Sequence, residues 1–161
     1  MDGGITIIID TADIGHLVSR LGSLADPELS ELMTMIGALG ESQTRRRIEE
    51  EKTAPDGSAW PPNKEGTSIL RRTGRHLLDS IAFEAGSNEV QWGSSWEFAH
   101  VHQFGGTIVP KSAEALAFQI GGRWVHAQRV VIPARPFVGL SSENAKEIEE
   151  LATDWFEGLL Q

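Results

Sequence analysis

Two histidines spaced two residues apart are the residues of this chain that most suggest chemistry. His100 and His102 lie in the segment FAHVHQFGG, residues 98–106. On a β-strand, side chains at positions i and i+2 share one face, so both imidazoles could bind a zinc or iron ion. Glu97 is the only carboxylate nearby. These three residues define one hypothesis, a small metal-dependent hydrolase, and the competing interpretation is a strand that runs into a Gly-Gly turn.

The other sequence patterns favour a protein that is not an enzyme. The sequence contains no HExxH zinc motif, no GxSxG nucleophile elbow and no phosphate-binding GxxxxGK[ST] loop. It also contains no cysteine, which excludes disulfides and thiolate metal sites. We therefore expect no catalytic residue, no cofactor and no bound metal.

The length and composition predict a single domain. The chain has 161 residues, of which 40% are hydrophobic, and it carries a net charge of −9. Residues 26–161 are expected to form the domain proper, and residues 1–25 an N-terminal extension whose packing the sequence does not define. The net charge argues against binding to the outside of DNA. No apolar run approaches the roughly 20 residues that span a bilayer, so we expect no membrane association.

The charged residues are unevenly distributed. Residues 1–40 and residues 141–161 each contain six acids and one base, whereas bases cluster at 45–47 and again at Arg71, Arg72 and Arg75. Acidic ends and a mixed centre are typical either of solvated helix faces or of docking between copies. The second basic cluster could bind phosphate or an acidic neighbouring copy, and we favour the neighbour.

The periodicity of apolar residues predicts an α+β fold. A long helix is expected from Asp26-Pro27 to about Lys52, because a capping residue and a proline precede apolar positions at helical spacing. Gly37 and Gly40 within it indicate a close contact or a bend. A short helix at 75–80 and a last helix capped by Ser141 or Ser142 follow, and residues 97–104 form a helical turn or a strand. Strands are expected at 5–10, 81–84, 90–92, 107–109, 116–120, 123–125 and 130–132. The predicted architecture is a central antiparallel sheet built from hairpins, packed by the long helix and the C-terminal helix.

Two further segments suggest anchoring positions. Trp60 lies in a polar loop, where it either anchors the loop on the core or contacts a partner. In the segment IPARPFVG, residues 132–139, two prolines fix an extended path. We expect Arg135 between them to form an ion pair or to cap backbone carbonyls rather than bind a ligand. Phe137 is expected to anchor the core or an interface, and Phe104 to anchor the turn at Gly105 and Gly106.

Four motifs in order resemble a known family. They are PDGSAWPP at 55–62, ILRRTGRHLLDSI at 69–81, HQFGG at 102–106 and IPARPFVG at 132–139. Together they resemble the phage virion morphogenesis family, the tail-completion or neck proteins of Mu-like and P2-like tailed phages. The resemblance spans about residues 27–161. The first 25 residues do not match the family pattern, and the insertion between Gly106 and Ile132 looks variable.

The resemblance implies a non-enzymatic structural protein at the head–tail junction of the virion, assembled in the host cytoplasm. It implies a homo-oligomeric ring, a hexamer being one option, that joins a connector or portal-side protein to the tail tube or tail terminator protein. DNA would pass through without specific binding, and the acidic surplus could line that channel. One candidate contact between copies is the basic cluster at 71–75 against the acidic C-terminal helix. The candidate interface or framework residues are Trp60, Arg71, Arg72, Arg75, His100, His102, Phe104, Gly105, Gly106, Arg135 and Phe137.

Overall fold

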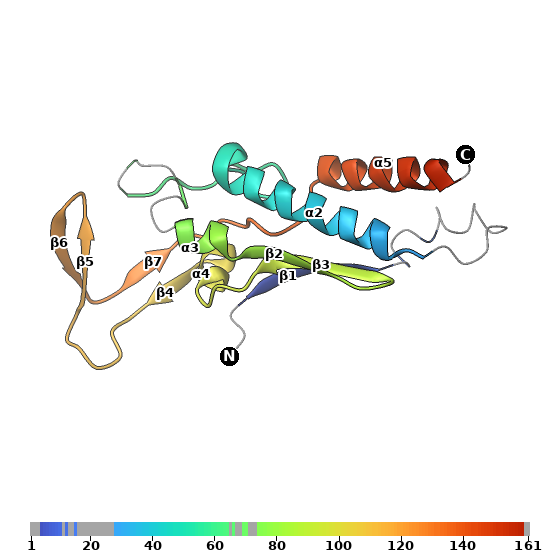
Figure 1. Ribbon diagram of the computed structural model, residues 1–161. Helices are drawn as coiled ribbons and strands as arrows, with labels where there is room; N and C mark the ends of the chain where they lie inside the picture. The colour runs from blue at the N-terminus through green and yellow to red at the C-terminus, as the bar shows by residue number, and fades with distance from the viewer. Residues whose placement is uncertain are drawn as a thin grey trace.

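A three-stranded antiparallel sheet forms the centre of the body (Figure 1). The computed structural model describes residues 4–10, 12, 15, 28–64, 66, 69–70 and 74–159. The strand order is β1(Ile5–Asp10), β3(Glu89–Ser94) and β2(Ile81–Ala85). Trp92 of β3 is paired with Ile7 of β1 on one side and with Phe83 of β2 on the other. The predicted first strand and the predicted hairpin at 81–92 are confirmed.

The long helix covers one face of this sheet. It comprises α2(Ser30–Arg46) and a π-helical turn, Arg47–Glu51, and ends at Lys52 in the left-handed conformation with φ 55°. The predicted end near Lys52 is therefore confirmed. The predicted start at Asp26-Pro27 is wrong by about one turn, because Glu28 is not helical and α2 begins at Ser30; residues 26 and 27, like most of residues 1–25, lie outside the described residues.

Two helical glycines bring α2 close to the sheet. A Cβ atom added at Gly37 would lie 2.3 Å from the Phe83 ring, and one at Gly40 would lie 2.3 Å from the Trp92 ring. Real Cβ atoms do not approach other atoms so closely, so a side chain at either position would push the helix away. The close contact expected at these glycines is thus formed with the sheet.

The second long helix, α5(Ser142–Leu159), packs beside α2 (Figure 1). The Ser141 hydroxyl accepts a hydrogen bond from the Asn144 backbone N–H at 3.1 Å, so Ser141 caps the helix as predicted. Residues from α2, β1, β3 and α5 form one core cluster. Its buried members are Ile9, Leu32, Met33, Ile36, Val90, Trp92, Ile148, Ala152 and Phe156.

A second core cluster lies where α3(Gly74–Asp79) and α4(Ala99–Phe104) flank the sheet. It joins the end of the long helix and the loop after it to the segment near Phe137. Its buried members are Ile48, Ala54, Trp60, Leu70, Leu77, Ile81, Ala99, Phe137 and Val138. The strand alternative for residues 97–104 is wrong, because six of these residues form a helix that packs Ala99 into this cluster.

The remaining strands form two separate two-stranded sheets. Short strands β4(Gly106–Ile108) and β7(Val130–Ile132) pair with each other, and β5(Leu116–Ile120) pairs with β6(Arg123–Ala127). The prediction of one central sheet is wrong for the strand at 130–132, since its partner is β4. We call residues 106–132 the arm, which extends from one end of the body (Figure 1). The α+β class is confirmed.

Candidate functional site

The root of the arm is a segment of extended chain held by buried side chains. We call residues 133–139 the anchored segment. The Trp60 indole is 5% exposed and donates from Nε1 to the Pro136 carbonyl at 3.0 Å. Arg135, also buried, donates from Nε to the Pro61 carbonyl at 2.8 Å and from a terminal nitrogen to the Pro62 carbonyl at 3.0 Å. Trp60 is therefore a core anchor, and Arg135 binds the loop carbonyls.

The two halves of the split HQFGG…IPARPFVG pattern meet through one glutamine. Gln103 of α4 accepts hydrogen bonds at Oε1 from the backbone N–H groups of Phe137 and Val138, at 3.0 and 3.1 Å. Its amide nitrogen donates to the Val138 carbonyl at 2.8 Å. One buried side chain thus satisfies three backbone groups of a segment that no sheet pairs. The sequence interpretation missed this role of Gln103.

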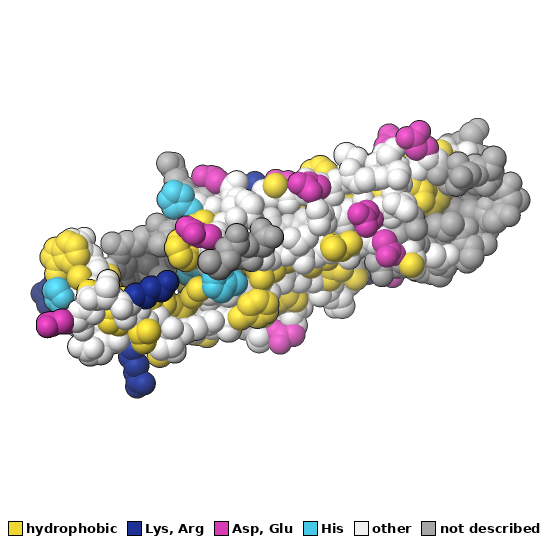
Figure 2. Space-filling view, turned by 90° about the horizontal axis from the view of Figure 1, so that it is seen from below, with side chains coloured by type: hydrophobic (Ala, Val, Ile, Leu, Met, Phe, Trp, Pro, Cys, Tyr) yellow, Lys and Arg dark blue, Asp and Glu magenta, His cyan; other side chains and the backbone are white. Residues whose placement is uncertain are grey.

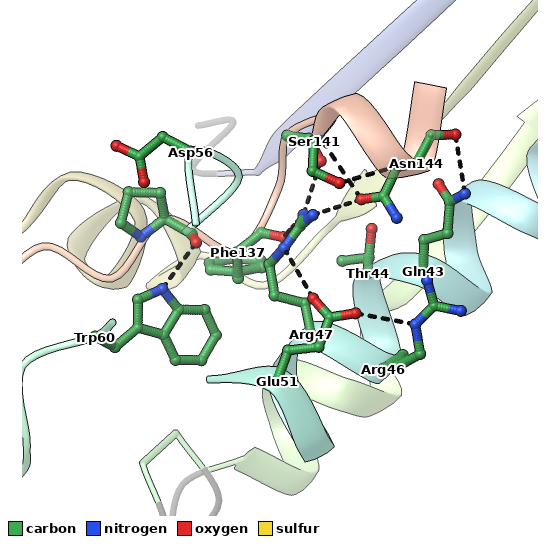
Figure 3. Close-up of polar contacts among 12 residues, drawn as sticks. Gln43, Thr44, Arg46, Arg47, Glu51, Asp56, Trp60, Phe137, Ser141 and Asn144 are labelled. Atoms are coloured by element: carbon green, nitrogen blue, oxygen red, sulfur yellow. Dashed lines mark hydrogen bonds and ion pairs between the residues drawn. The ribbon is translucent and has the colours of Figure 1, made fainter. Parts of the chain in front are cut away.

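A buried arginine holds the other end of the anchored segment (Figure 3). Arg47 is 1% exposed and donates to the carbonyls of Phe137 at 3.2 Å and Gly139 at 2.7 Å. It also donates to Asn144 Oδ1 at 2.5 Å, and Glu51 lies 3.8 Å from its Nε. Burial lowers the pKa of Arg47 despite the neighbouring carboxylate. Arg47 therefore joins the long helix, the anchored segment and α5.

The sequence contained a signal that predicts the burial of Arg47. Buried positions of the long helix recur at helical spacing from Leu32 through Ile36, Gly40 and Gln43 to Arg47. A charged residue on an apolar stripe must find partners, and here the partners are two carbonyls and a side-chain amide oxygen. Gln43 extends the same network, donating to the Asn144 carbonyl at 3.2 Å.

The two histidines do not form a metal pair. On helix α4, positions i and i+2 point about 200° apart. His100 is exposed and its Nδ1 lies 2.9 Å from the Glu97 carbonyl oxygen rather than its carboxylate. His102 instead stacks on Trp96, with ring centroids 5.5 Å apart. Within the described part of the chain, no group of three or more potential ligands gathers around a possible metal position.

His102 is a structural residue at the root of the arm. Its backbone carbonyl accepts a hydrogen bond from the Arg135 N–H at 2.7 Å. Burial, and secondarily the charge of Arg135, lowers the pKa of His102. Both effects favour the neutral imidazole in the folded protein.

The Gly-Gly turn begins the arm. Gly105 has φ 72°, and a Cβ atom there would lie 2.8 Å from the Ile132 carbonyl oxygen, so this position requires glycine. Gly106 is the first residue of β4. Phe137 is completely buried, but Phe104 is 69% exposed. The expectation that Phe104 anchors the turn is wrong within one chain, because its side chain lies outside both core clusters.

The arm itself exposes large apolar side chains. Trp124 is 67% exposed, and Ile108, Val109 and Val131 are also exposed. Neither core cluster of the described residues includes a residue of the arm. The arm contains three bases and one acid, whereas the rest of the chain carries the negative charge. Figure 2 shows basic side chains at the arm end of this face and most acidic ones along the body.

Comparison with known proteins decides what kind of molecule carries this arm. The chain matches the phage virion morphogenesis family over residues 9–157. The chain belongs to this family. A curated relative, "Mu-like prophage FluMu G protein 2" of Haemophilus influenzae (strain ATCC 51907 / DSM 11121 / KW20 / Rd), is 31% identical over 160 residues, covering 98% of this chain and 99% of that protein. No solved structure matches the chain.

Membership of the phage virion morphogenesis family confirms the resemblance inferred from the four motifs. It gives the chain a structural role in building a phage virion, in a family that is generally non-enzymatic. The matched residues 9–157 span the whole arm. In the described parts of the chain, no helix is both long and apolar enough to cross a bilayer.

The second basic cluster, Arg71, Arg72 and Arg75, is predicted as an interface, but the structure describes little of it. Arg71 and Arg72 lie outside the described residues, as does the side chain of Arg75 in α3. Their pairing with an acidic helix of a neighbouring copy therefore stays a prediction. The first basic cluster makes its contacts within the chain, since Arg46 binds Glu51 at 2.9 Å and Glu147 of α5 at 3.2 Å.

Proposed function

We propose that this member of the phage virion morphogenesis family acts at the head–tail junction as a neck or tail-completion protein. We further propose that it does so as a homo-oligomeric ring. The observation that carries the proposal is the arm, residues 106–132, whose exposed apolar side chains are presented on a firmly anchored root. Figure 1 shows the arm extending beyond the layers of the body, where another subunit can reach it.

The arm exposes apolar side chains that its own two short sheets do not bury. An isolated two-stranded hairpin is only marginally stable in water, and exposed tryptophan is typical of interface hot spots rather than of free surface. Trp124 faces solvent on β6, across from Gln119 of β5 in the hairpin register. A partner that covers this hairpin would bury the indole and stabilise the strand pairing. Self-assembly offers such a partner in every neighbouring copy.

An arm at one end of a subunit favours a ring. When a surface at one end binds a different surface of the next copy, the contact is heterologous, and repetition closes into a ring if the rotation permits. In this proposal one side of the ring binds the connector or portal-side protein. The other side binds the tail tube or tail terminator protein. The net charge of −9 suits a ring through which DNA moves, because like charge disfavours adhesion to the duplex.

The test is the mass of the purified full-length protein, measured by light scattering alone and mixed with connector and tail proteins of the same phage. We expect a closed multi-subunit species, either alone or in the mixture. A chain that stays monomeric and binds neither neighbour would contradict the proposal. A one-to-one complex with a single neighbour would identify an adaptor that forms no ring.

A further inference from the structure

The surface between α2 and α5 has an apolar trough that no other described element fills. Met35 and Leu39 of α2 face Leu151 and Trp155 of α5 across a volume of about 690 Å³. Each pair is spaced four residues apart, so each lines one side of a helix. Met35 is 39% exposed. The trough is an open depression, so a side chain of another chain can lie along it.

Acidic side chains border this trough. Glu147, Glu150 and Asp154 line its α5 side, and Arg46 is the only base among its lining residues. That arginine is already bound to Glu147 and to Glu51. The trough therefore combines an apolar floor with a net negative border, and the chemistry that fits it is an apolar group beside a positive charge.

The tip of the arm has this chemistry. Trp124 is the most exposed tryptophan described, and Arg123 precedes it at the start of β6. Arg129 lies in the connection between β6 and β7, and both arginines are exposed. With Lys111 they give the arm three bases against one acid, Glu114. At the tip itself, the exposed indole beside Arg123 fits an apolar trough with an acidic border.

We infer that the arm of one copy docks into the α2–α5 trough of the next copy. Trp124 enters between the apolar side chains of the two helices, and Arg123 meets Asp154 on the acidic border. The tip of the hairpin and helix α5 lie at different ends of the molecule, so the contact joins two copies rather than closing within one (Figure 1). The inference rests on the proposed ring and supplies its interface.

Substitutions on the two sides should act as a pair. Arg123→Glu and Asp154→Arg should each weaken self-association several-fold, because each places like charges together. Combined in one chain, they should recover most of the loss. Glu149→Arg is the matched control: it is an exposed acid of α5 that does not line the trough. It should leave self-association unchanged.

A cysteine cross-link tests the contact directly, because the natural chain contains no cysteine. Gln119 lies on the same face of the hairpin as Trp124, and Glu150 borders the trough; both are exposed. The variant Gln119→Cys with Glu150→Cys should form covalent dimers and higher ladders under oxidation or with a short bismaleimide. Gln119→Cys with Glu149→Cys should form far fewer. The same cysteines on two separate chains, once mixed, should yield only dimers.

The outcomes separate this inference from the proposed ring. Cross-linked ladders with the Glu150 pair and not with the control pair support arm docking. If light scattering shows an oligomer but the Glu150 pair gives no more product than the control, the docking contact is wrong while the ring stands. If the protein is monomeric at every concentration and gives no cross-link, self-association and docking both fail.

Discussion

The anchored segment and the arm are neighbours in the chain, but they differ in where their polar and apolar groups find partners. In residues 133–139, buried side chains from the long helix, the following loop and α4 bind the backbone groups that no strand pairs. In residues 106–132, the strands pair only with each other, and large apolar side chains remain exposed. The first region is complete within one chain. In our proposal a partner completes the second, and the buried contacts of the root fix the direction in which the arm is presented.

The largest effect is expected from Arg47→Met, which keeps much of the side-chain volume but removes the charge. The carbonyls of Phe137 and Gly139 and the Asn144 amide oxygen would lose their buried donor. Several unsatisfied buried groups at about 1–3 kcal/mol each predict a loss of roughly 3 kcal/mol or more in the free energy of unfolding. Chemical denaturation measures it. Arg129→Met, on the exposed arm, is the control, and a similar loss there would contradict the comparison.

A smaller effect is expected from Gln103→Leu. Two backbone N–H groups and one carbonyl of the anchored segment would lose their partner, while the apolar volume is nearly kept. We expect a loss of about 2 kcal/mol in the free energy of unfolding. Gln119→Leu on the exposed face of the hairpin should change it by less than about 0.5 kcal/mol. Equal losses at the two glutamines would show that α4 does not hold the segment.

The pH dependence of stability should report on His102 at the root of the arm. Its pKa in the folded protein is lowered, mainly by burial, so the unfolded chain binds the proton more readily. Stability should therefore fall as the pH drops through about 6.5, the ordinary value of an unfolded histidine, and level off below the folded pKa. His102→Phe keeps a ring against Trp96 and should flatten that slope. An unchanged slope would contradict the account, and His126→Phe controls for the loss of an exposed imidazole.

The smallest effect on folding is expected in the arm. Trp124→Ala should change the free energy of unfolding of the monomer by less than about 0.5 kcal/mol, because the indole is largely exposed. Denaturation at concentrations below self-association measures it. A loss near 2 kcal/mol would mean that the indole packs within its own chain, and the distinction between arm and anchored segment would fail.

The sequence predicted the regular elements well because their signals are local. The run of β-branched residues in β1 and the apolar stripes of α2 and α5 lie within single segments, and the cap at Ser141 needs only three residues. The six-residue helix α4 was left undecided because so short a segment has little periodicity. The pairing of β7 with β4 depends on contacts between distant segments, which spacing alone does not define.

The site was harder to predict than the elements. The burial of Phe137 and the carbonyl contacts of Arg135 agree with expectations drawn from the two prolines. Helical spacing places Arg47 on the buried stripe of the long helix, but its partners and those of Gln103 lie more than thirty residues away, where no local pattern identifies them. The sequence predicts Phe104 as an anchor of the Gly-Gly turn, yet its side chain is exposed beside the arm, and sequence alone does not separate a buried aromatic residue from an exposed one.

The central claim is that this family member assembles through its arm. The most direct test compares the mass in solution of the wild type with that of a variant of the arm. Wild-type chain and Trp124→Ala should be compared by light scattering at matched concentrations, with denaturation showing that both are folded. We predict a multi-subunit species for the wild type and a shift of the variant toward the monomer. Identical masses for the two folded proteins would contradict the claim.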